Sequence, residues 1–144
     1  MKILVAIDFS DPTDSILRVA HKLAQSLDAS LWLVHVAEPE PDFVGYDAGP
    51  DVVRDQVAKR FRNEHRVMQG HADAMREDGI DAKAMLVQGS TIETLLEMRE
   101  KQQSDLIVVG SHGRGMVAEM LLGSVSQGLI RAAACPVTVV PMKR

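Results

Sequence analysis

Three glycines and a serine near the carboxyl end of the chain have a spacing that could hold a phosphate group. Gly110 and Gly113 enclose two residues, and Gly123 and Ser124 follow nine residues further on. Glycine lets a ligand approach the main chain closely, and the start of a helix offers unpaired N–H groups and positive dipole charge. If a helix begins near Gly123, this spacing predicts a nucleotide held by main-chain amides.

A second candidate group is the carboxylate of Asp8, which directly follows the apolar run from Lys2 to Ile7. A short run rich in Ile and Val is typical of a buried strand. A carboxylate at the end of such a strand could accept hydrogen bonds from ribose hydroxyls or hold a metal ion. A structural interpretation stays open beside this one, in which Asp8 stabilises the turn that precedes the next helix.

The elements that must position these residues alternate along the chain. Five short apolar runs are expected to be strands, at residues 2–7, 30–36, 82–88, 105–109 and 137–141. Helices are expected within residues 11–27, 51–78 and 123–134, with a further one beginning near Ile92. Connections of this length suit right-handed crossovers between parallel strands. The pattern predicts an α/β fold: an open, doubly wound, five-stranded parallel sheet with helices on both faces.

Such a sheet would bring the two candidate groups together. Ligands of doubly wound sheets bind beyond the carboxyl ends of the strands, where the winding direction reverses. With the strand order 3-2-1-4-5, this point lies between the first strand, which leads into Asp8, and the fourth, which leads into Gly110. We therefore expect the carboxylate and the glycines to share one crevice, although they lie far apart in the sequence.

Two other nucleotide-binding motifs fit the sequence poorly. The P-loop pattern Gly-x4-Gly-Lys-Ser/Thr is absent, and with it the lysine that reaches the outer phosphates. Residues 113–118 do match Gly-x-Gly-x-x-Ala. However, they follow the fourth expected strand instead of the first, and apolar residues stand where the acidic ribose partner would be expected. We interpret this second match as coincidental.

The composition indicates one globular domain, residues 1–144. Apolar residues make up 46% and charged residues 25% of the chain, close to the averages of such domains. The 16 Lys and Arg residues are outnumbered by 20 Asp and Glu residues, which argues against nucleic acid as a partner. We expect no membrane insertion, because no apolar run approaches about 18 residues. A single cysteine, Cys135, and an amino terminus unlike a signal peptide favour a cytoplasmic location.

Four segments of the sequence, taken together, resemble the universal stress protein family. They are VAIDFS at residues 5–10, VHV at 34–36, the glycine spacing that runs from Gly110 to Ser126, and CPVTVV at 135–140. The glycine spacing is similar to that of the family's ATP-binding branch. The resemblance covers the whole chain and implies an adenine nucleotide alpha hydrolase-like fold. It also implies an ATP-binding regulatory protein of the stress response, with a regulatory protein as a possible partner.

The resemblance further implies a set of binding residues for ATP, together with Mg²⁺ or Mn²⁺. Asp8 would bind the ribose and could share the metal ion, and the main chain at Val36 would contact adenine. The phosphates would be cradled by main-chain groups of Gly110, Gly113, Gly123, Ser124, Val125 and Ser126. Family members commonly form homodimers by pairing the last strand, here from Val137 to Pro141. An apolar strand left unpaired at a sheet edge would otherwise favour aggregation.

Some residues near the glycines have two possible interpretations. Arg114 could pair with the terminal phosphates or be a solvated loop charge. His112 could contact a phosphate or shuttle a proton, or it could pack or face solvent. Apolar residues at 116, 120, 121 and 122 could cover a ligand or contact a partner, or they could form a packed loop wall.

Two functions other than regulation by bound ATP remain open from the residues. One is a slow ATP hydrolase, in which Asp8 would hold a divalent ion and loop amides would stabilise phosphoryl charge. The sequence lacks the lysine, glutamine or second acidic strand end of a dedicated phosphoryl-transfer site, which argues against efficient turnover. The other is a protein-interaction module that works without nucleotide, and the intact glycine spacing argues against it.

Overall fold

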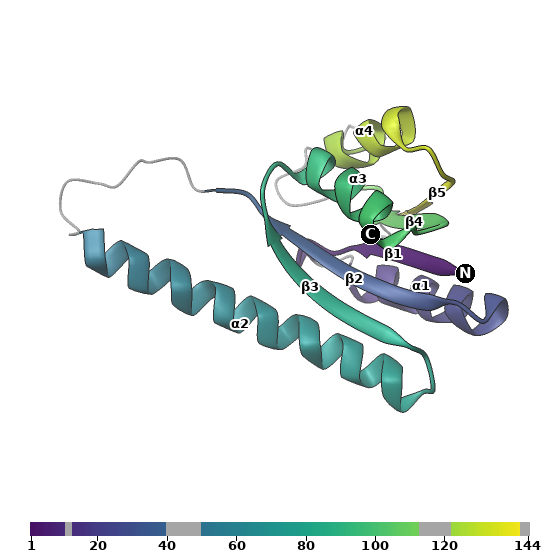
Figure 1. Cartoon of the computed structure of the whole chain (residues 1–144), viewed down its shortest axis with the longest axis horizontal. Helices are drawn as coiled ribbons and strands as arrows, with labels where there is room; N and C mark the ends of the chain where they lie inside the picture. Colours follow the sequence, from purple (N-terminus) through teal and green to yellow (C-terminus); the bar gives the residue numbers. More distant parts are fainter. Residues whose placement is uncertain (11–12, 40–49, 113–121, 142–144) are drawn as a thin grey trace.

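The computed structural model describes residues 1–10, 13–39, 50–112 and 122–141, and in these ranges strands and helices alternate (Figure 1). The strands are β1 (Lys2–Ala6), β2 (Ser30–Ala37), β3 (Ala82–Gln88), β4 (Leu106–Gly110) and β5 (Val137–Val140). The helices are α1 (Thr13–Leu27), α2 (Pro50–Glu77), α3 (Thr91–Gln102) and α4 (Ser124–Ala132). Each expected element is present, because the switch between short apolar runs and amphipathic segments is the main determinant of such elements.

The strands form a single five-stranded sheet in the order β3-β2-β1-β4-β5. All neighbouring pairs are parallel, and Ile3 of the central strand pairs with Leu31 on one side and with Leu106 on the other. The predicted α/β class, the parallel sheet and the strand order are therefore confirmed. The winding reverses between β1 and β4, because the helices that follow them, α1 and α4, pack on opposite faces of the sheet. A ligand can bind at such a point.

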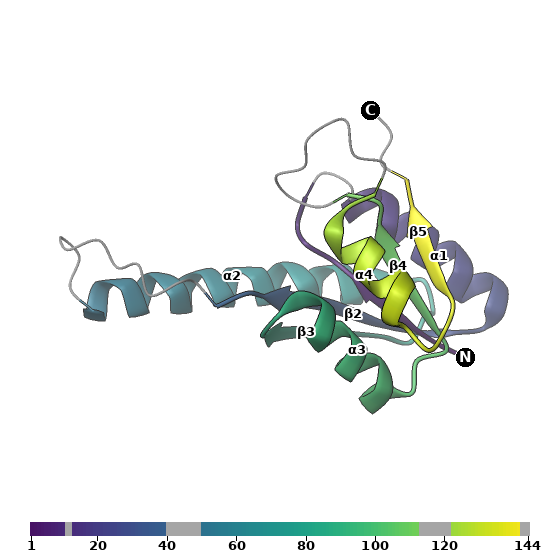
Figure 2. The ribbon, with the colours of Figure 1, turned by 90° about the horizontal axis from the view of Figure 1, so that it is seen from above.

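Alternate residues of the strands build the two halves of the core. Ile3 of β1 packs in one cluster with residues of α1 and α2, such as Met68. Leu4, the next residue, packs in the other cluster with Leu95 of α3 and Leu129 of α4. Successive side chains of a strand point to opposite faces of the sheet, so the sheet has a helix pair on each face (Figures 1 and 2).

Helix α2 is longer than the part of the sheet that it covers, and its amino-terminal half extends beyond the strands in Figure 1. Among its described side chains, none before Met68 is buried. The carboxyl-terminal half is anchored by Met68, Ala72 and Met75 in the core. The middle of the helix therefore passes the carboxyl end of β2, where side chains of α2 can reach the ligand-binding edge.

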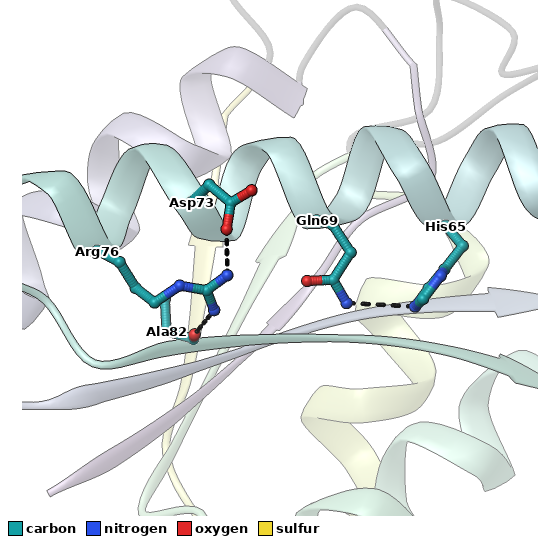
Figure 3. Close-up of polar contacts among 5 residues, drawn as sticks. All are labelled: His65, Gln69, Asp73, Arg76 and Ala82. Carbon is teal, nitrogen blue, oxygen red and sulfur yellow. Dashed lines mark hydrogen bonds and ion pairs between the residues drawn. The ribbon is translucent and has the colours of Figure 1, made fainter.

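Polar contacts add to the attachment of α2 (Figure 3). The Arg76 guanidinium donates to the carbonyl oxygen of Ala82 over 2.5 Å and pairs with Asp73. Within α2, one turn toward the amino terminus from Asp73, the side-chain nitrogen of Gln69 lies 3.2 Å from Nε2 of His65. The bond from Arg76 joins the helix to the first residue of β3, so it helps to define where the helix lies along the sheet.

Candidate functional site

A cleft of about 440 Å³ lies at the carboxyl ends of β1, β2 and β4. Its wall includes Asp8, Val36, Gly110, Ser124 and Val125. These predicted site residues come from four separate parts of the sequence, and the sheet brings them together. The volume falls within the range of about 300–1,000 Å³ that is typical of small-molecule sites.

Two other predicted residues that the structure describes, Gly123 and Ser126, do not line this cleft. Gly113 and Arg114 lie outside the described residues, as do residues 116, 120 and 121. The amide of Gly123 donates to the carbonyl oxygen of Ser111 over 2.6 Å. The buried hydroxyl of Ser126 donates to the carbonyl oxygen of Gly123 over 2.9 Å. In this arrangement the Gly123 amide and the Ser126 hydroxyl are both engaged within the chain.

Three main-chain amides at the start of α4 have no acceptor among the described residues. The helix begins at Ser124 after an extended Gly123, and no side chain caps it. Gln127 is the first residue of the helix whose amide bonds back, to the carbonyl oxygen of Gly123 at 3.0 Å. The amides of Ser124, Val125 and Ser126 meet no acceptor among the described residues. Unpaired amides and the positive end of the helix dipole form an anion site.

The carboxylate of Asp8 is held in place by the residue two positions later. Its Oδ1 atom accepts hydrogen bonds from the Ser10 amide at 3.0 Å and from the Ser10 hydroxyl at 2.5 Å. Its Oδ2 atom has no partner in the part of the chain that the structure describes. The structural and the ligand-binding interpretations of Asp8 are thus compatible, because one oxygen stabilises the turn and the other remains available.

The turn after β1 contains a strained residue. Phe9 has a φ of 59°, in the left-handed region that bulky residues rarely adopt. Its ring packs on that of His35, with centroids 4.5 Å apart. Strain of this kind persists only where the surroundings enforce it, and it often occurs at binding sites. Here it turns the chain so that the Ser10 amide points back to Asp8.

The main-chain groups of Val36 face the cleft on the β1 side of β2, where the strand pairing has ended. The carbonyl oxygen of Val34 accepts from the Ile7 amide, so residue 34 directs its main-chain groups toward β1. Val36, two residues on, directs its groups the same way, but β1 has ended at Ala6. No described residue that follows β1 bonds to Val36. An amide and a carbonyl are therefore available for the edge of a planar ligand.

Gly110 has a packing reason to lack a side chain. An added Cβ atom would lie 3.0 Å from Cδ1 of Ile16 on α1 and 3.3 Å from the carbonyl oxygen of His112. The absence of a side chain lets α1 approach the end of β4, and it also keeps this side of the cleft open. The residue type alone does not separate these two roles.

Several cleft residues were missed by the sequence analysis. Arg60 and Glu64 of α2 line the cleft, as do His35 and the pair formed by Thr91 and Glu38, in which the Thr91 hydroxyl donates over 2.8 Å. His112, for which two interpretations were open, also lines the cleft. The charged helix carries no spacing that distinguishes a cleft-facing carboxylate from a solvated one. Only the position of α2 relative to the sheet identifies Arg60 and Glu64.

The described residues contain no group of three His, Cys, Asp or Glu side chains that could hold a metal ion. Asp8 alone would supply one ligand, and phosphate oxygens would have to supply others. The same described part contains no helix that is both long and apolar enough to cross a membrane.

Comparison with known proteins gives a consistent family assignment. The sequence model of the universal stress protein family matches residues 1–141. A universal stress protein of Thermus aquaticus, encoded beside a QAH/OAS sulfhydrylase gene, is 35% identical over 139 residues, which cover 96% of each chain. Among solved structures, UspA of Lactobacillus plantarum superposes with a TM-score of 0.84 over 97% of each chain, at 20% identity.

Two further structures of similar fold contain nucleotides. A universal stress protein in complex with cAMP has a TM-score of 0.67 and 22% identity, and it covers 98% of this chain and 96% of its own. One from Archaeoglobus fulgidus in complex with dAMP has a TM-score of 0.63 and 19% identity, over 97% of each chain. At these identities the likeness establishes the fold, and the ligands are properties of those two proteins.

Proposed function

The chain belongs to the universal stress protein family, and we propose from this premise that it is a regulatory protein that binds ATP in the described cleft. The observation that carries the proposal is the convergence of two unlike groups. The unpaired amides of Ser124 and Val125 suit an anion, and the Asp8 carboxylate in the same cleft suits hydroxyl donors. A nucleotide carries phosphates and a ribose in one molecule, so a single ligand of this class has a partner for each group.

The proposed placement assigns one part of ATP to each group of residues. The main chain of Val36 binds the edge of adenine, Asp8 binds the ribose, and the first amides of α4 bind phosphate. Gly113 and Arg114 complete the phosphate site in this proposal, as the glycine spacing suggests. The cAMP and dAMP complexes of related proteins support an adenine nucleotide as the ligand class.

A divalent ion is part of the proposed ligand. The chemistry of the site fits Mg²⁺ or Mn²⁺, because both take carboxylate and phosphate oxygens and Mg²⁺ is commonly bound by one or two carboxylates plus substrate phosphates. In our proposal Asp8 is that carboxylate. The protein holds and orients the nucleotide, and we do not propose rapid hydrolysis, because the sequence has no P-loop lysine motif.

We further propose that the protein acts in the cytoplasm as a homodimer. Strand β5 is at the edge of the sheet, and in β5 the described residues Val137 and Val139 are only partly buried. Pairing of two β5 strands would satisfy the outward main-chain groups and cover these side chains. A regulatory partner protein would then recognise the nucleotide-bound dimer.

The bound ligand is the direct test of the proposal. The protein is purified without added nucleotide and denatured, and the released small molecules are identified by chromatography and mass spectrometry. The stripped protein is then titrated with ATP by calorimetry, and its melting temperature is followed. We expect ATP to bind and to raise the melting temperature. If no adenine nucleotide co-purifies and ATP gives neither heat nor a melting shift, the proposal is wrong.

A further inference from the structure

Glu64 of α2 lines the cleft opposite the predicted site residues. Its side chain is only 17% exposed. The Oε1 atom lies 3.9 Å from the Nε atom of Arg60, at the limit of an ion pair. The Oε2 atom is buried and accepts no hydrogen bond from the residues that the structure describes. The structure thus places a carboxylate in the wall of a ligand cleft with one oxygen lacking a donor.

The ring of His35 lies beside this oxygen but does not donate a hydrogen bond to it. His35 Nε2 lies 3.7 Å from Glu64 Oε2, which is too far for a hydrogen bond. His35 Nδ1 is 2.7 Å from the carbonyl oxygen of Ile7, an acceptor only, so Nδ1 carries the proton. A neutral ring would therefore present an acceptor to the carboxylate, and a protonated ring at 3.7 Å would still lie beyond hydrogen-bond distance.

An arrangement of this kind calls for a donor from outside the chain. A buried carboxylate oxygen without a partner is unfavourable, and such groups in native proteins have a specific reason. The cleft reaches the Glu64 side chain, and a small rotation of its carboxylate would direct an oxygen to a molecule bound there. The adenosine part of a nucleotide carries suitable donors, namely the exocyclic amino group and the ribose hydroxyls.

We propose that Glu64 determines specificity by accepting a hydrogen bond from an N–H or O–H donor on the nucleoside part of the ligand. This inference rests on the proposed nucleotide function and adds a residue on α2 to it. It also predicts selectivity, because an acceptor at the same position of the ligand would face a carboxylate and be rejected.

Two substitutions test the role of the carboxylate. Glu64→Met keeps the length of the side chain and removes both acceptors. Glu64→Gln keeps one acceptor and places an amide donor opposite His35 Nε2. Glu77→Gln, an exposed position of the same helix, is the matched control. Calorimetry measures the affinity of each protein for ATP, 2′-deoxyATP, 3′-deoxyATP and purine riboside triphosphate, which lacks the amino group.

We expect Glu64→Met to bind ATP about tenfold or more weakly than the wild type, the usual scale of a charge-assisted hydrogen bond. Glu64→Gln should lose less affinity for ATP, and the affinity of Glu77→Gln should equal that of the wild type. One of the three analogues lacks the donor that Glu64 recognises. We expect the wild type and Glu64→Met to bind this analogue with equal affinity, so the analogue that abolishes the difference identifies the donor. Without nucleotide, both Glu64 variants melt at or above the wild-type temperature, because the unpartnered oxygen is gone.

Three results overturn the inference. Unchanged ATP affinity of Glu64→Met overturns it while the proposed function stands. The inference is also overturned if Glu64→Met has a lower melting temperature without nucleotide and the same relative affinities for the four ligands as the wild type. Glu64 would then have a structural role. Absence of binding by the wild type overturns the proposed function and this inference together.

Discussion

The imidazole of His35 donates a hydrogen bond from Nδ1 to the carbonyl oxygen of Ile7 over 2.7 Å. This bond joins the end of β2 to the residue just after β1, where the two strands separate to form the cleft. The ring also packs against Phe9, so one side chain supports both the strand ends and the strained turn that carries Asp8.

We expect His35→Phe to lower the free energy of unfolding by about 1–3 kcal/mol, the cost of leaving a buried carbonyl without its donor. An aromatic ring remains to pack on Phe9, so the loss reports the hydrogen bond. Urea denaturation measures it. His65→Phe, at an exposed position of α2, serves as the control. Equal stability of His35→Phe and the wild type would show that the bond to Ile7 contributes nothing.

Asp8→Asn should weaken ATP binding about tenfold and reduce its dependence on Mg²⁺, because the amide retains the bond to Ser10 but loses the charge. Calorimetry with Mg²⁺ and with EDTA gives both quantities. Ser10→Ala removes only the hydroxyl that bonds to Asp8 and should have a smaller effect. If Asp8→Asn binds Mg²⁺-ATP as the wild type does, Asp8 is not part of the ligand site.

Ser124→Pro tests the main-chain phosphate site. Proline is tolerated at the first position of a helix, and it removes an amide that has no acceptor within the helix. The extended Gly123 before it is compatible with a following proline. We expect an unchanged melting temperature without nucleotide and an affinity for ATP lower by about tenfold.

Ser124→Ala retains this amide and is the matched control for Ser124→Pro. It should bind ATP nearly as the wild type does if the main chain, and not the hydroxyl, contacts phosphate. Equal affinity of the proline and alanine variants would contradict the assignment of the Ser124 amide.

Gly110→Ala should lower the free energy of unfolding by about 1–3 kcal/mol, because the added Cβ atom meets Cδ1 of Ile16 at 3.0 Å in a packed core. Ile16→Val removes that methyl group. The double variant should therefore be more stable than the sum of the two single losses predicts. Simple additivity, measured by denaturant unfolding, would exclude this contact as the reason for glycine.

Val139→Pro tests the proposed dimer through β5. The carbonyl oxygens of Pro136 and Val140 accept hydrogen bonds from the β4 side, so the intervening Val139 directs its amide away from β4. Proline at this edge position removes only an outward donor. Light scattering should show a monomer for Val139→Pro and a dimer for the wild type and Val139→Ala. A dimeric proline variant would place the interface elsewhere.

Much of the fold follows from local patterns in the sequence. Each strand is a short, mainly apolar run, the first four of these runs are followed by polar or glycine residues, and each helix has a periodic apolar face. Asp8 and Gly110 were predicted to share a crevice because parallel strands place their carboxyl ends at one edge of the sheet. That prediction needs only the strand order, and the structure confirms the order and places both residues in one cleft.

Other parts of the site depend on distances that the sequence does not encode locally. Arg60 and Glu64 face the cleft because Met68 and its neighbours anchor α2 at one place along the sheet, and a helix shifted by one turn would present other side chains. The main chain of Val36 is available because β1 ends one residue earlier than the apolar run does.

The sequence by itself determined which groups were present for binding: a carboxylate after the first strand, glycines after the fourth, and a helix start. Only the tertiary structure decided which of them are available to a ligand. The Gly123 amide is engaged by Ser111. Within the described part of the chain, the amides of Ser124 and Val125 at the cleft meet no acceptor, and Glu64 adds an oxygen that meets no donor. Availability depends on hydrogen bonds between residues far apart in the chain, and these form only when the packed elements bring them together.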